Sequence, residues 1–118
     1  MPVVTITQPD RYKVGSTWRF PLRRKNPDGS PILLDGLEIR AVFRIGAVDG
    51  ELLAELTGGA GIERDDANGL IIMEIDAVTS APAPANSWVY FEAEMIASNG
   101  YVWQSPTYRF KTEAQVTL

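Results

Sequence analysis

Apolar side chains recur at every second position along several segments of this chain, and this spacing restricts its fold more than any other feature. The alternating apolar positions are Trp18, Phe20 and Leu22; Leu37, Ile39, Ala41, Phe43 and Ile45; Ile71, Met73 and Ile75; Val89, Phe91, Ala93 and Met95; and Tyr108 and Phe110. Successive side chains of a β-strand point to opposite faces, so this pattern buries one face and leaves the other in water. Such half-buried strands are typical of antiparallel sheets.

Four Asx-Gly steps separate the alternating segments, and they are Asp28-Gly29, Asp49-Gly50, Asn68-Gly69 and Asn99-Gly100. Such pairs favour tight hairpins in which both central residues have positive φ, because glycine has no Cβ to clash. The expected strands are 3–7, 16–24, 37–45, 51–57, 69–76, 88–97 and 101–111. No long segment has a helical repeat, and the best candidate for helix is one turn at 77–80, which Pro82 and Pro84 stop.

The chain has 118 residues, which is the length of one domain. Short alternating strands with regular turn signals are typical of a β-sandwich. We therefore predict an all-β fold, an immunoglobulin-like antiparallel β-sandwich of about seven strands. This single domain is expected to cover residues 1–118, and residues 1–13 can form an extended arm.

The sequence contains no cysteine and no histidine. Disulfides, thiolate nucleophiles, cysteine-ligated zinc and iron–sulfur clusters are therefore excluded, together with the commonest general base and the commonest metal ligand. The sequence also lacks a phosphate-binding loop and a dinucleotide-binding motif. These observations predict a protein that is not an enzyme and that holds no metal or cofactor.

The chain carries 11 basic and 15 acidic side chains, which give a formal net charge of −4. An acidic domain is poorly suited to nucleic acid, which requires a basic face. The longest apolar run, Leu70-Ile71-Ile72-Met73, is far shorter than the roughly 20 residues of a membrane-spanning helix. The N-terminal residues lack the basic start and apolar block of a secretory signal. We therefore expect synthesis in a cytoplasm, with neither nucleic acid nor membrane as a partner.

An acidic stretch comprising Glu63, Asp65, Asp66 and Asn68 resembles part of a calcium loop. Calcium binds six to eight oxygen ligands, and the calcium-loop pattern requires a glutamate at a fixed distance that is missing here. A solvated turn before Asn68-Gly69 is therefore the favoured interpretation.

Two carboxylates, Glu92 and Glu94, lie two residues apart on one expected strand and so share its outer face. Their spacing of roughly 7 Å is compatible with a glycosidase pair, but catalysis would require one of them to be buried. Cross-strand ion pairs are the favoured alternative. The expected partners are Arg40 and Arg44 for Glu92 and Glu94, and Arg19 and Arg23 for Glu74 and Asp76.

One basic cluster, Arg23-Arg24-Lys25, follows the second expected strand. Nucleic-acid binding is not favoured, because exposed aromatic residues are not interleaved with it. The cluster either solvates the end of a strand or meets an acidic patch on a protein partner.

An aromatic group consisting of Trp88, Tyr90, Tyr101 and Trp103 lies on two expected strands that Asn99-Gly100 joins. Three roles are open for it: a partial rim of the core, a protein interface, or a platform that stacks on sugar rings.

Taken in order, these elements resemble a small immunoglobulin-like domain of tailed phages and prophages, found in baseplate and other tail-associated proteins. The matching segments are Gly15-Ser16-Thr17-Trp18-Arg19-Phe20; the D-G-x-P turn with its apolar pair and D-G step over 28–36; the arginine-bearing strand over 39–44; Gly61-Ile62 with 67–75; the strand over 89–95; and Val116-Thr117. The resemblance spans residues 14–117 and carries no catalytic residue.

This resemblance implies a non-enzymatic structural module of a phage or prophage particle, located in the tail, baseplate or head–tail region. Its expected partners are other virion proteins or further copies of itself, so its expected location is the virion. Candidate contacts are the aromatic group and Val3, Val4 and Thr5, which can add as a strand to a neighbouring subunit. A carbohydrate-binding module that uses the same aromatic residues is the alternative.

Overall fold

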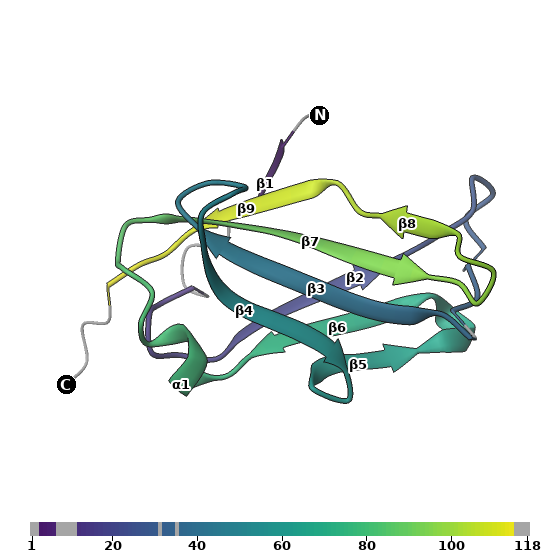
Figure 1. Cartoon of the computed structure of the whole chain (residues 1–118), viewed down its shortest axis with the longest axis horizontal. Helices are drawn as coiled ribbons and strands as arrows, with labels where there is room; N and C mark the ends of the chain where they lie inside the picture. The colour runs from purple at the N-terminus through teal and green to yellow at the C-terminus, as the bar shows by residue number, and fades with distance from the viewer. Residues whose placement is uncertain (1–2, 7–11, 31, 35, 115–118) are drawn as a thin grey trace.

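The computed structural model describes residues 3–6, 12–30, 32–34 and 36–114, and these residues form a nearly all-β fold (Figure 1). The strands are β1 (Val3–Ile6), β2 (Trp18–Arg23), β3 (Glu38–Ile45), β4 (Glu51–Gly58), β5 (Gly61–Asp65), β6 (Leu70–Ile75), β7 (Trp88–Ile96), β8 (Val102–Gln104) and β9 (Thr107–Lys111). One helical turn, α1 (Ala77–Ser80), and one 3-10 turn, η1 (Asp66–Asn68), complete the described elements. The predicted all-β fold and the helical turn at 77–80 are both confirmed.

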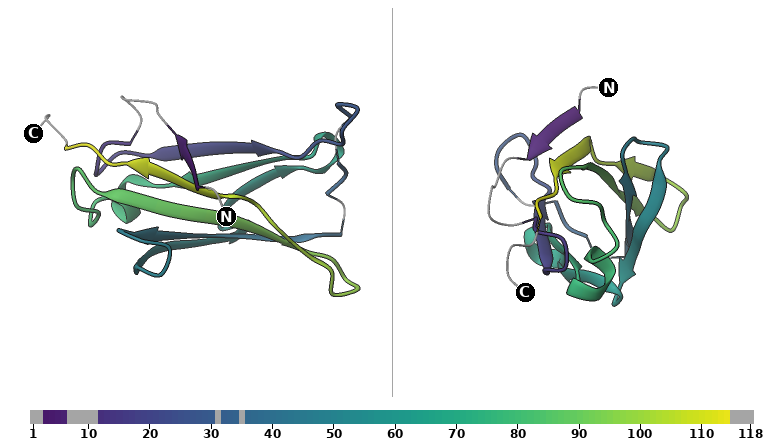
Figure 2. Two further views of the ribbon diagram at one scale, coloured as in Figure 1. Left: turned by 90° about the horizontal axis from the view of Figure 1, so that it is seen from above. Right: turned by 90° about the vertical axis from the view of Figure 1, so that its left-hand side faces the viewer.

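The strands form one curled sheet in the order β1-β9-β7-β3-β4-β5-β6-β2, and β8 pairs separately with β7. The curl brings β2, β6 and β5 over β9, β7 and β3, so the sheet folds over into two facing layers (Figure 2). The strands at the two ends of the order, β1 and β2, are not hydrogen-bonded to each other. The fold is therefore sandwich-like with an open seam.

Aromatic rings from both layers fill the space between them. Phe20 of β2 lies 4.9 Å from the Phe91 ring of β7 and 5.0 Å from the Phe110 ring of β9. Trp18 is fully buried, and its indole N–H donates to the Lys13 carbonyl at 2.9 Å. Each buried ring removes a large apolar area from water, so this cluster is a main source of the stability of the fold. These rings lie at the alternating positions, as predicted.

The structure has nine strands among its described residues, where the sequence predicted about seven, and two of its strand pairings are parallel. β5 is missing from the prediction because Ile62 is its one buried apolar residue, so it shows no alternation. The expected strand 101–111 divides at Ser105 and Pro106. The Ser105 hydroxyl accepts from the Ala93 amide at 2.9 Å, while the Ser105 amide donates to the Ala93 carbonyl.

All four Asx-Gly steps lie in or beside turns, but the geometry differs from the expected tight hairpin. Among the described residues outside glycine, only Asn86 has a positive φ, so the Asx residues do not adopt it. The turn between β7 and β8 is wider, since the Ala97 amide donates to the Tyr101 carbonyl at 2.9 Å. Longer loops built in this way place a single positive-φ glycine near their end, as at Gly100.

Parts of the predicted pattern lie outside the described residues. These are Thr7 of the first expected strand, residues 1–2 and 7–11 of the expected arm, Pro31 and Asp35 of the 28–36 segment, and Val116-Thr117. Residues 3–6 of the expected arm form a strand of the sheet, because β1 runs parallel to β9 with Val4 opposite Tyr108.

Candidate interaction surfaces

Trp88 and Tyr90 lie on the outer face of β7, beside two cations of β9. The Arg109 guanidinium lies 4.1 Å from the centroid of a Trp88 ring, and the Lys111 ammonium lies 5.9 Å from it. Arg109 also donates to the Thr5 hydroxyl at 2.9 Å, which joins β1 to the same face. We call Thr5, Trp88, Arg109 and Lys111 the outer patch.

Beside the outer patch, β1 is a terminal strand of the sheet. Its inner edge pairs with β9, and no strand of the described residues pairs with its outer edge. Val3 and Val4 are 41 % and 43 % exposed, which is high for apolar strand residues. The three predicted contact residues, Val3, Val4 and Thr5, therefore lie on an edge that can accept a further strand.

The structure divides the predicted aromatic group into two parts. Trp103 of β8 lies opposite Met95, at the end of β7, whereas Trp88 lies at its beginning. Opposite residues of an antiparallel pair share a face, so Trp103 lies on the core-facing side, with the buried Met95, and Trp88 on the outer side. Tyr101 lies in the turn before β8 and is 68 % exposed. The prediction of one aromatic group is wrong because the expected strand 101–111 is two strands. Trp88 lies beside β9, whereas Trp103 belongs to β8.

Arg24, at the end of β2, covers the Trp103 ring. Its guanidinium carbon lies 3.9 Å from the ring centroid, and Nη1 donates to the buried Met95 sulfur at 3.7 Å. The Arg24 amide donates to the Gly69 carbonyl, and its carbonyl accepts from the Ile32 amide. Burial lowers the pKa of Arg24, and the nearby Tyr101 hydroxyl partly opposes this shift. The guanidinium nevertheless stays charged at neutral pH.

A groove follows the open seam of the sheet, between β2 on one side and β1, β8 and β9 on the other. Around Arg24 it holds about 270 Å³ of open space, lined by Arg23, Arg24, Lys25, Ile32, Trp103 and Pro106. A second hollow of about 270 Å³ lies further along β2, lined by Ile6, Tyr12, Phe20, Pro21 and Phe91. Leu22, Arg23 and Tyr108 line both hollows, so the two are adjacent. We call the two adjacent hollows together the seam groove.

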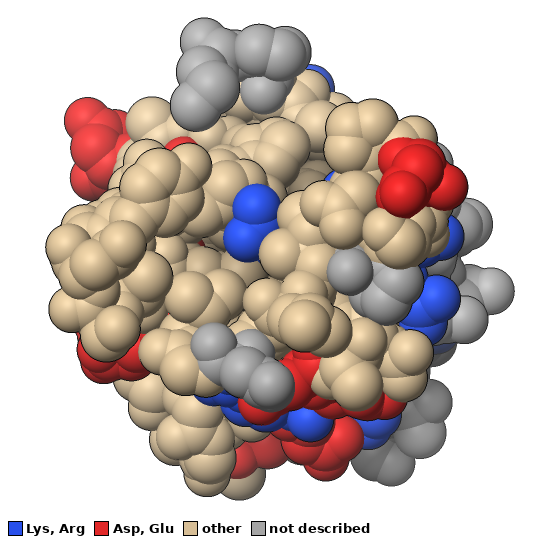
Figure 3. All heavy atoms as spheres, turned by 90° about the vertical axis from the view of Figure 1, so that its right-hand side faces the viewer, with Lys and Arg blue, Asp and Glu red and all other residues tan. Residues whose placement is uncertain are grey.

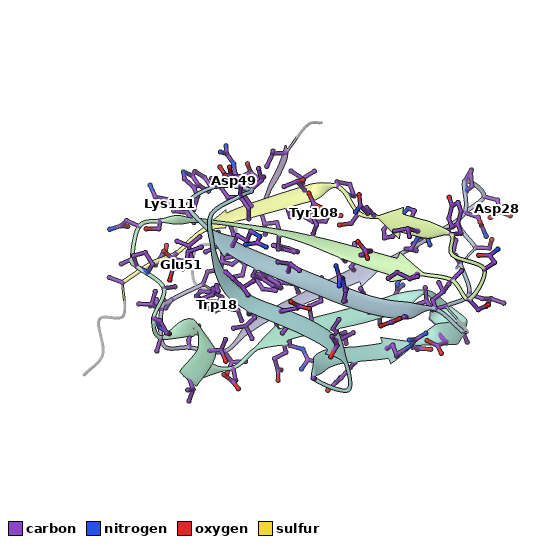
Figure 4. The ribbon with its side chains drawn as sticks, viewed as in Figure 1. Trp18, Asp28, Asp49, Glu51, Tyr108 and Lys111 are labelled. Carbon is purple, nitrogen blue, oxygen red and sulfur yellow. The ribbon has the colours of Figure 1, made fainter. Side chains whose placement is uncertain are left out.

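Figure 3 shows the end of the molecule where β2 ends and β8 begins. Lys and Arg atoms lie near its centre, in a hollow between uncharged side chains, while acidic side chains lie nearer its rim. Figure 4 places Asp28 at this end and Lys111 at the opposite end. The Arg24 end of the seam groove, which follows β2, therefore lies at the opposite end of the molecule from Lys111 of the outer patch.

The basic cluster has no acidic partner in the described part of the chain. The ion pairs of that part involve Arg19, Arg40 and Arg64, and none involves Arg23, Arg24 or Lys25. The sequence identified this cluster but did not place aromatic residues beside it, because Trp103 and Tyr108 come from strands far along the chain. No local pattern could have shown that contact.

The expected ion-pair partners are half correct. Arg40 lies opposite Glu94 with 3.5 Å between their charged atoms, and Arg19 lies 3.1 Å from Glu74. The other two expected pairs are wrong, because the register places Arg44 opposite Tyr90 and Arg23 opposite Leu70. The remaining partners of these pairs bind elsewhere: the Asp76 carboxylate accepts from the Thr79 amide, and Glu92 accepts from the Thr107 hydroxyl.

The acidic stretch before Gly69 does not form a metal site in the described residues. The Asp66 carboxylate lies 2.6 Å from Arg64, and the Asp65 carboxylate accepts from the Asn68 amide group at 2.7 Å. Arg64 also donates to the Leu34 and Leu37 carbonyls at 2.6 and 2.7 Å. These contacts make the stretch a support for the loop that precedes β3. No helix of the described residues is long and apolar enough to cross a bilayer.

Comparison with known proteins supports the fold. No family model matches the chain, and no curated protein matches it. Among solved structures, CopC from Methylosinus trichosporium OB3b is similar, with a TM-score of 0.50 and 15% identity over 98% of this chain and 87% of that chain. Extracellular domains 3–5 of Drosophila OTK match with a TM-score of 0.38 and 12% identity, over 98% of this chain and 33% of that chain. At such identities the likeness to CopC indicates a shared β-rich architecture alone.

Proposed function

We propose that this protein is a non-enzymatic interaction module of a tailed-phage or prophage particle, located in the tail, baseplate or head–tail region. The observation that supports a role in protein–protein contact is the free outer edge of β1 beside the outer patch. The resemblance of residues 14–117 to tail-associated immunoglobulin-like domains supports the proposed location in a phage particle.

The edge of β1 suits the addition of a strand from a neighbouring subunit. An unpaired strand offers a row of backbone N–H and C=O groups, and a partner strand that pairs with them is held by main-chain hydrogen bonds. Trp88 and Arg109 would then contact the side chains of the added strand, because aromatic and arginine side chains are frequent anchors of interfaces. Repetition of this contact by particle symmetry would produce multiple copies.

The contacts of the two candidate catalytic carboxylates support the non-enzymatic part of the proposal. Glu94 lies beside Arg40 and also accepts from the Gln104 side chain at 3.3 Å. Glu92 accepts from the Thr107 hydroxyl. The proton-donating acid of a glycosidase lies in apolar surroundings. Both carboxylates here instead contact polar or charged side chains.

The aromatic geometry does not favour the carbohydrate-binding alternative. A sugar platform requires rings that are exposed together on one face, whereas Trp88 and Trp103 lie on opposite faces of the sheet layer. A guanidinium also covers one face of each of these rings.

The test is the protein content of particles purified from the bacterium that carries the gene. We expect mass spectrometry to detect the chain in intact particles, and crosslinks from β1 to a second virion protein or another copy. Val3→Asp should reduce incorporation at least about ten-fold, because a charge on the edge strand opposes strand addition. The matched control is Val78→Asp on α1, where the valine is 83% exposed. Absence from the particles, or equal incorporation of both variants, would overturn the proposal.

A further inference from the structure

The geometry points to the seam groove as a docking site for an extended segment of a partner protein that carries carboxylates next to large apolar side chains. This inference rests on the proposed function, because it assumes that the protein acts through protein contacts. It assigns a second surface, to which β1 contributes Ile6, and states the chemistry of what binds there.

The first argument is charge complementarity. Arg23, Arg24 and Lys25 line one hollow of the groove, and no carboxylate of the described residues forms an ion pair with any of them. The chain as a whole has a formal net charge of −4, so this cationic cluster stands out against an acidic surface. Such a cluster attracts an acidic group and orients it on approach.

The second argument is that Arg24 is held ready for a carboxylate. Stacking on Trp103 at 3.9 Å fixes the plane of its guanidinium, and its backbone is held by Gly69 and Ile32. Within the described part of the chain, its one side-chain acceptor is the Met95 sulfur, which is a weak acceptor. Arginine donors form a planar fork that fits a carboxylate with two parallel hydrogen bonds. Little side-chain entropy remains to be lost on binding, because the group is already ordered.

Burial supports the same assignment. It lowers the pKa of Arg24, which means that the charged form has lost part of its hydration without gaining an acidic partner. A bound carboxylate would stabilise the charged guanidinium in place of the lost hydration. Because Arg24 is half-buried, salt would screen the attraction between the two groups less than at an exposed site.

The third argument is the apolar lining. Leu22, Ile32, Pro106 and Tyr108 form the walls around the cations, and Phe20 and Phe91 line the continuation of the groove. Two adjacent hollows of about 270 Å³ each have room for more than one side chain. An acidic segment without apolar side chains would leave these walls in contact with water. We therefore infer an occupant that carries both kinds of side chain.

The free edge of β2 favours recognition through side chains over the addition of a strand. The Arg24 amide donates to Gly69, so by alternation the amides of Phe20 and Leu22 also face β6. The nitrogen of Pro21 then faces the open seam, where proline has no N–H to offer. A ladder of backbone hydrogen bonds along β2 would be interrupted at its middle.

The test begins with selection of binders from a random peptide library displayed on yeast, with the full chain as bait. We expect enrichment of peptides in which aspartate or glutamate neighbours leucine, phenylalanine or tryptophan. An enriched peptide is then synthesised, and its binding is followed by calorimetry and by tryptophan fluorescence. Arg24→Gln should raise the Kd of this peptide at least about ten-fold, because the substitution removes the charged guanidinium donors.

Two further variants keep the test sharp. The double variant Arg23→Gln with Lys25→Gln leaves the Arg24–Trp103 stack intact. It should weaken peptide binding and make the Kd less dependent on salt concentration, while the protein stays folded. Arg40→Gln removes an equal charge from the outer face of β3, where Arg40 pairs with Glu94, and should leave the Kd unchanged. Thermal melts confirm that each variant is folded.

Several outcomes would overturn the inference: no enrichment, enrichment without acidic residues, or equal losses in Arg24→Gln and Arg40→Gln. If a thymidine oligonucleotide bound more tightly than the enriched peptide, the groove would be assigned to nucleic acid instead. Self-association that Arg24→Gln abolishes would assign it to another copy of this chain. A chain that is found in particles but binds no acidic peptide contradicts this inference alone. A chain that binds the peptide but is absent from particles contradicts only the proposed function.

Discussion

The guanidinium of Arg24 lies 3.9 Å from the centroid of the Trp103 ring and joins the end of β2 to β8 across the open seam. The two strands share no hydrogen-bonded ladder, since β2 pairs with β6 and β8 pairs with β7. The stack of Arg24 on Trp103 therefore bridges the two layers at the point where the sheet does not close. This contact also forms the centre of the proposed docking groove.

Removal of the Trp103 ring should destabilise the fold. Trp103 is half-buried and packs against the core cluster, so Trp103→Ala loses both this packing and the stack with Arg24. We expect a loss of about 2 kcal/mol in the free energy of unfolding, measured by urea denaturation. Trp103→Phe retains an aromatic face and should lose less than half of this value. Equal losses in the two variants would contradict the role of the stack.

Arg64 should matter more to stability than the other paired arginines. Its guanidinium donates to the Leu34 and Leu37 carbonyls and lies 2.6 Å from Asp66, so it fastens β5 to the loop before β3. Arg64→Gln leaves these acceptors without a donor, and we expect a loss of about 2–3 kcal/mol in denaturant unfolding. The control is Arg19→Gln, whose exposed ion pair should contribute less than about 1 kcal/mol.

Asp76 should make stability depend on pH in the acidic range. Hydrogen bonds from the Thr79 hydroxyl and from its backbone amide lower the pKa of Asp76 below its ordinary value. A carboxyl with a lowered pKa in the folded state stabilises the fold above its unfolded pKa of about 4. This contribution is lost as the pH falls through the folded-state value.

The measurement is the melting temperature as a function of pH. Asp76→Asn should reduce the fall in melting temperature below about pH 4, because asparagine can cap α1 but does not titrate. Thr79→Ala should have a smaller effect in the same direction, since it removes only the hydroxyl donor. Unchanged acid sensitivity in both variants would count against this assignment.

Pro21 should protect the open edge of β2 from pairing with another molecule. Pro21→Val supplies an N–H that faces the seam, so we expect increased self-association, measured by light scattering after size exclusion. The free energy of unfolding should change by less than about 1 kcal/mol, because Pro21 is exposed. Arg40→Val is the control: it places valine on β3, whose two edges are both paired. Association of both variants to the same extent would indicate a general effect of surface valine.

Much of the fold could be predicted from local pattern, because alternation reports burial wherever a strand has one buried face. β3 and β7 show this directly, with Ile39, Phe43, Val89 and Phe91 buried as expected. β5 could not be found, since a strand with one buried side chain shows no period. The division of 101–111 into β8 and β9 depends on the contact of Ser105 with Ala93, which lies on another strand.

The candidate surfaces were predictable only as residue types. The sequence identified the cluster of Arg23, Arg24 and Lys25 and the tryptophans separately, and it placed Trp88 and Trp103 in one group. Strand register separates these two rings and brings Trp103 to Arg24 instead. Register depends on which strands pair across the sheet, and residue spacing within a strand does not contain that information.

The sequence by itself determined the class of this protein: half-buried strands, turns at the Asx-Gly steps, and a chemistry without cysteine or histidine. These properties depend on each residue and its near neighbours, so they can be read along the chain. Only the tertiary structure decided that the sheet curls without closing, that β1 and β2 keep free edges, and that Arg24 covers Trp103. Those relationships join segments distant in sequence, and they follow from the packing of two layers around a shared aromatic core.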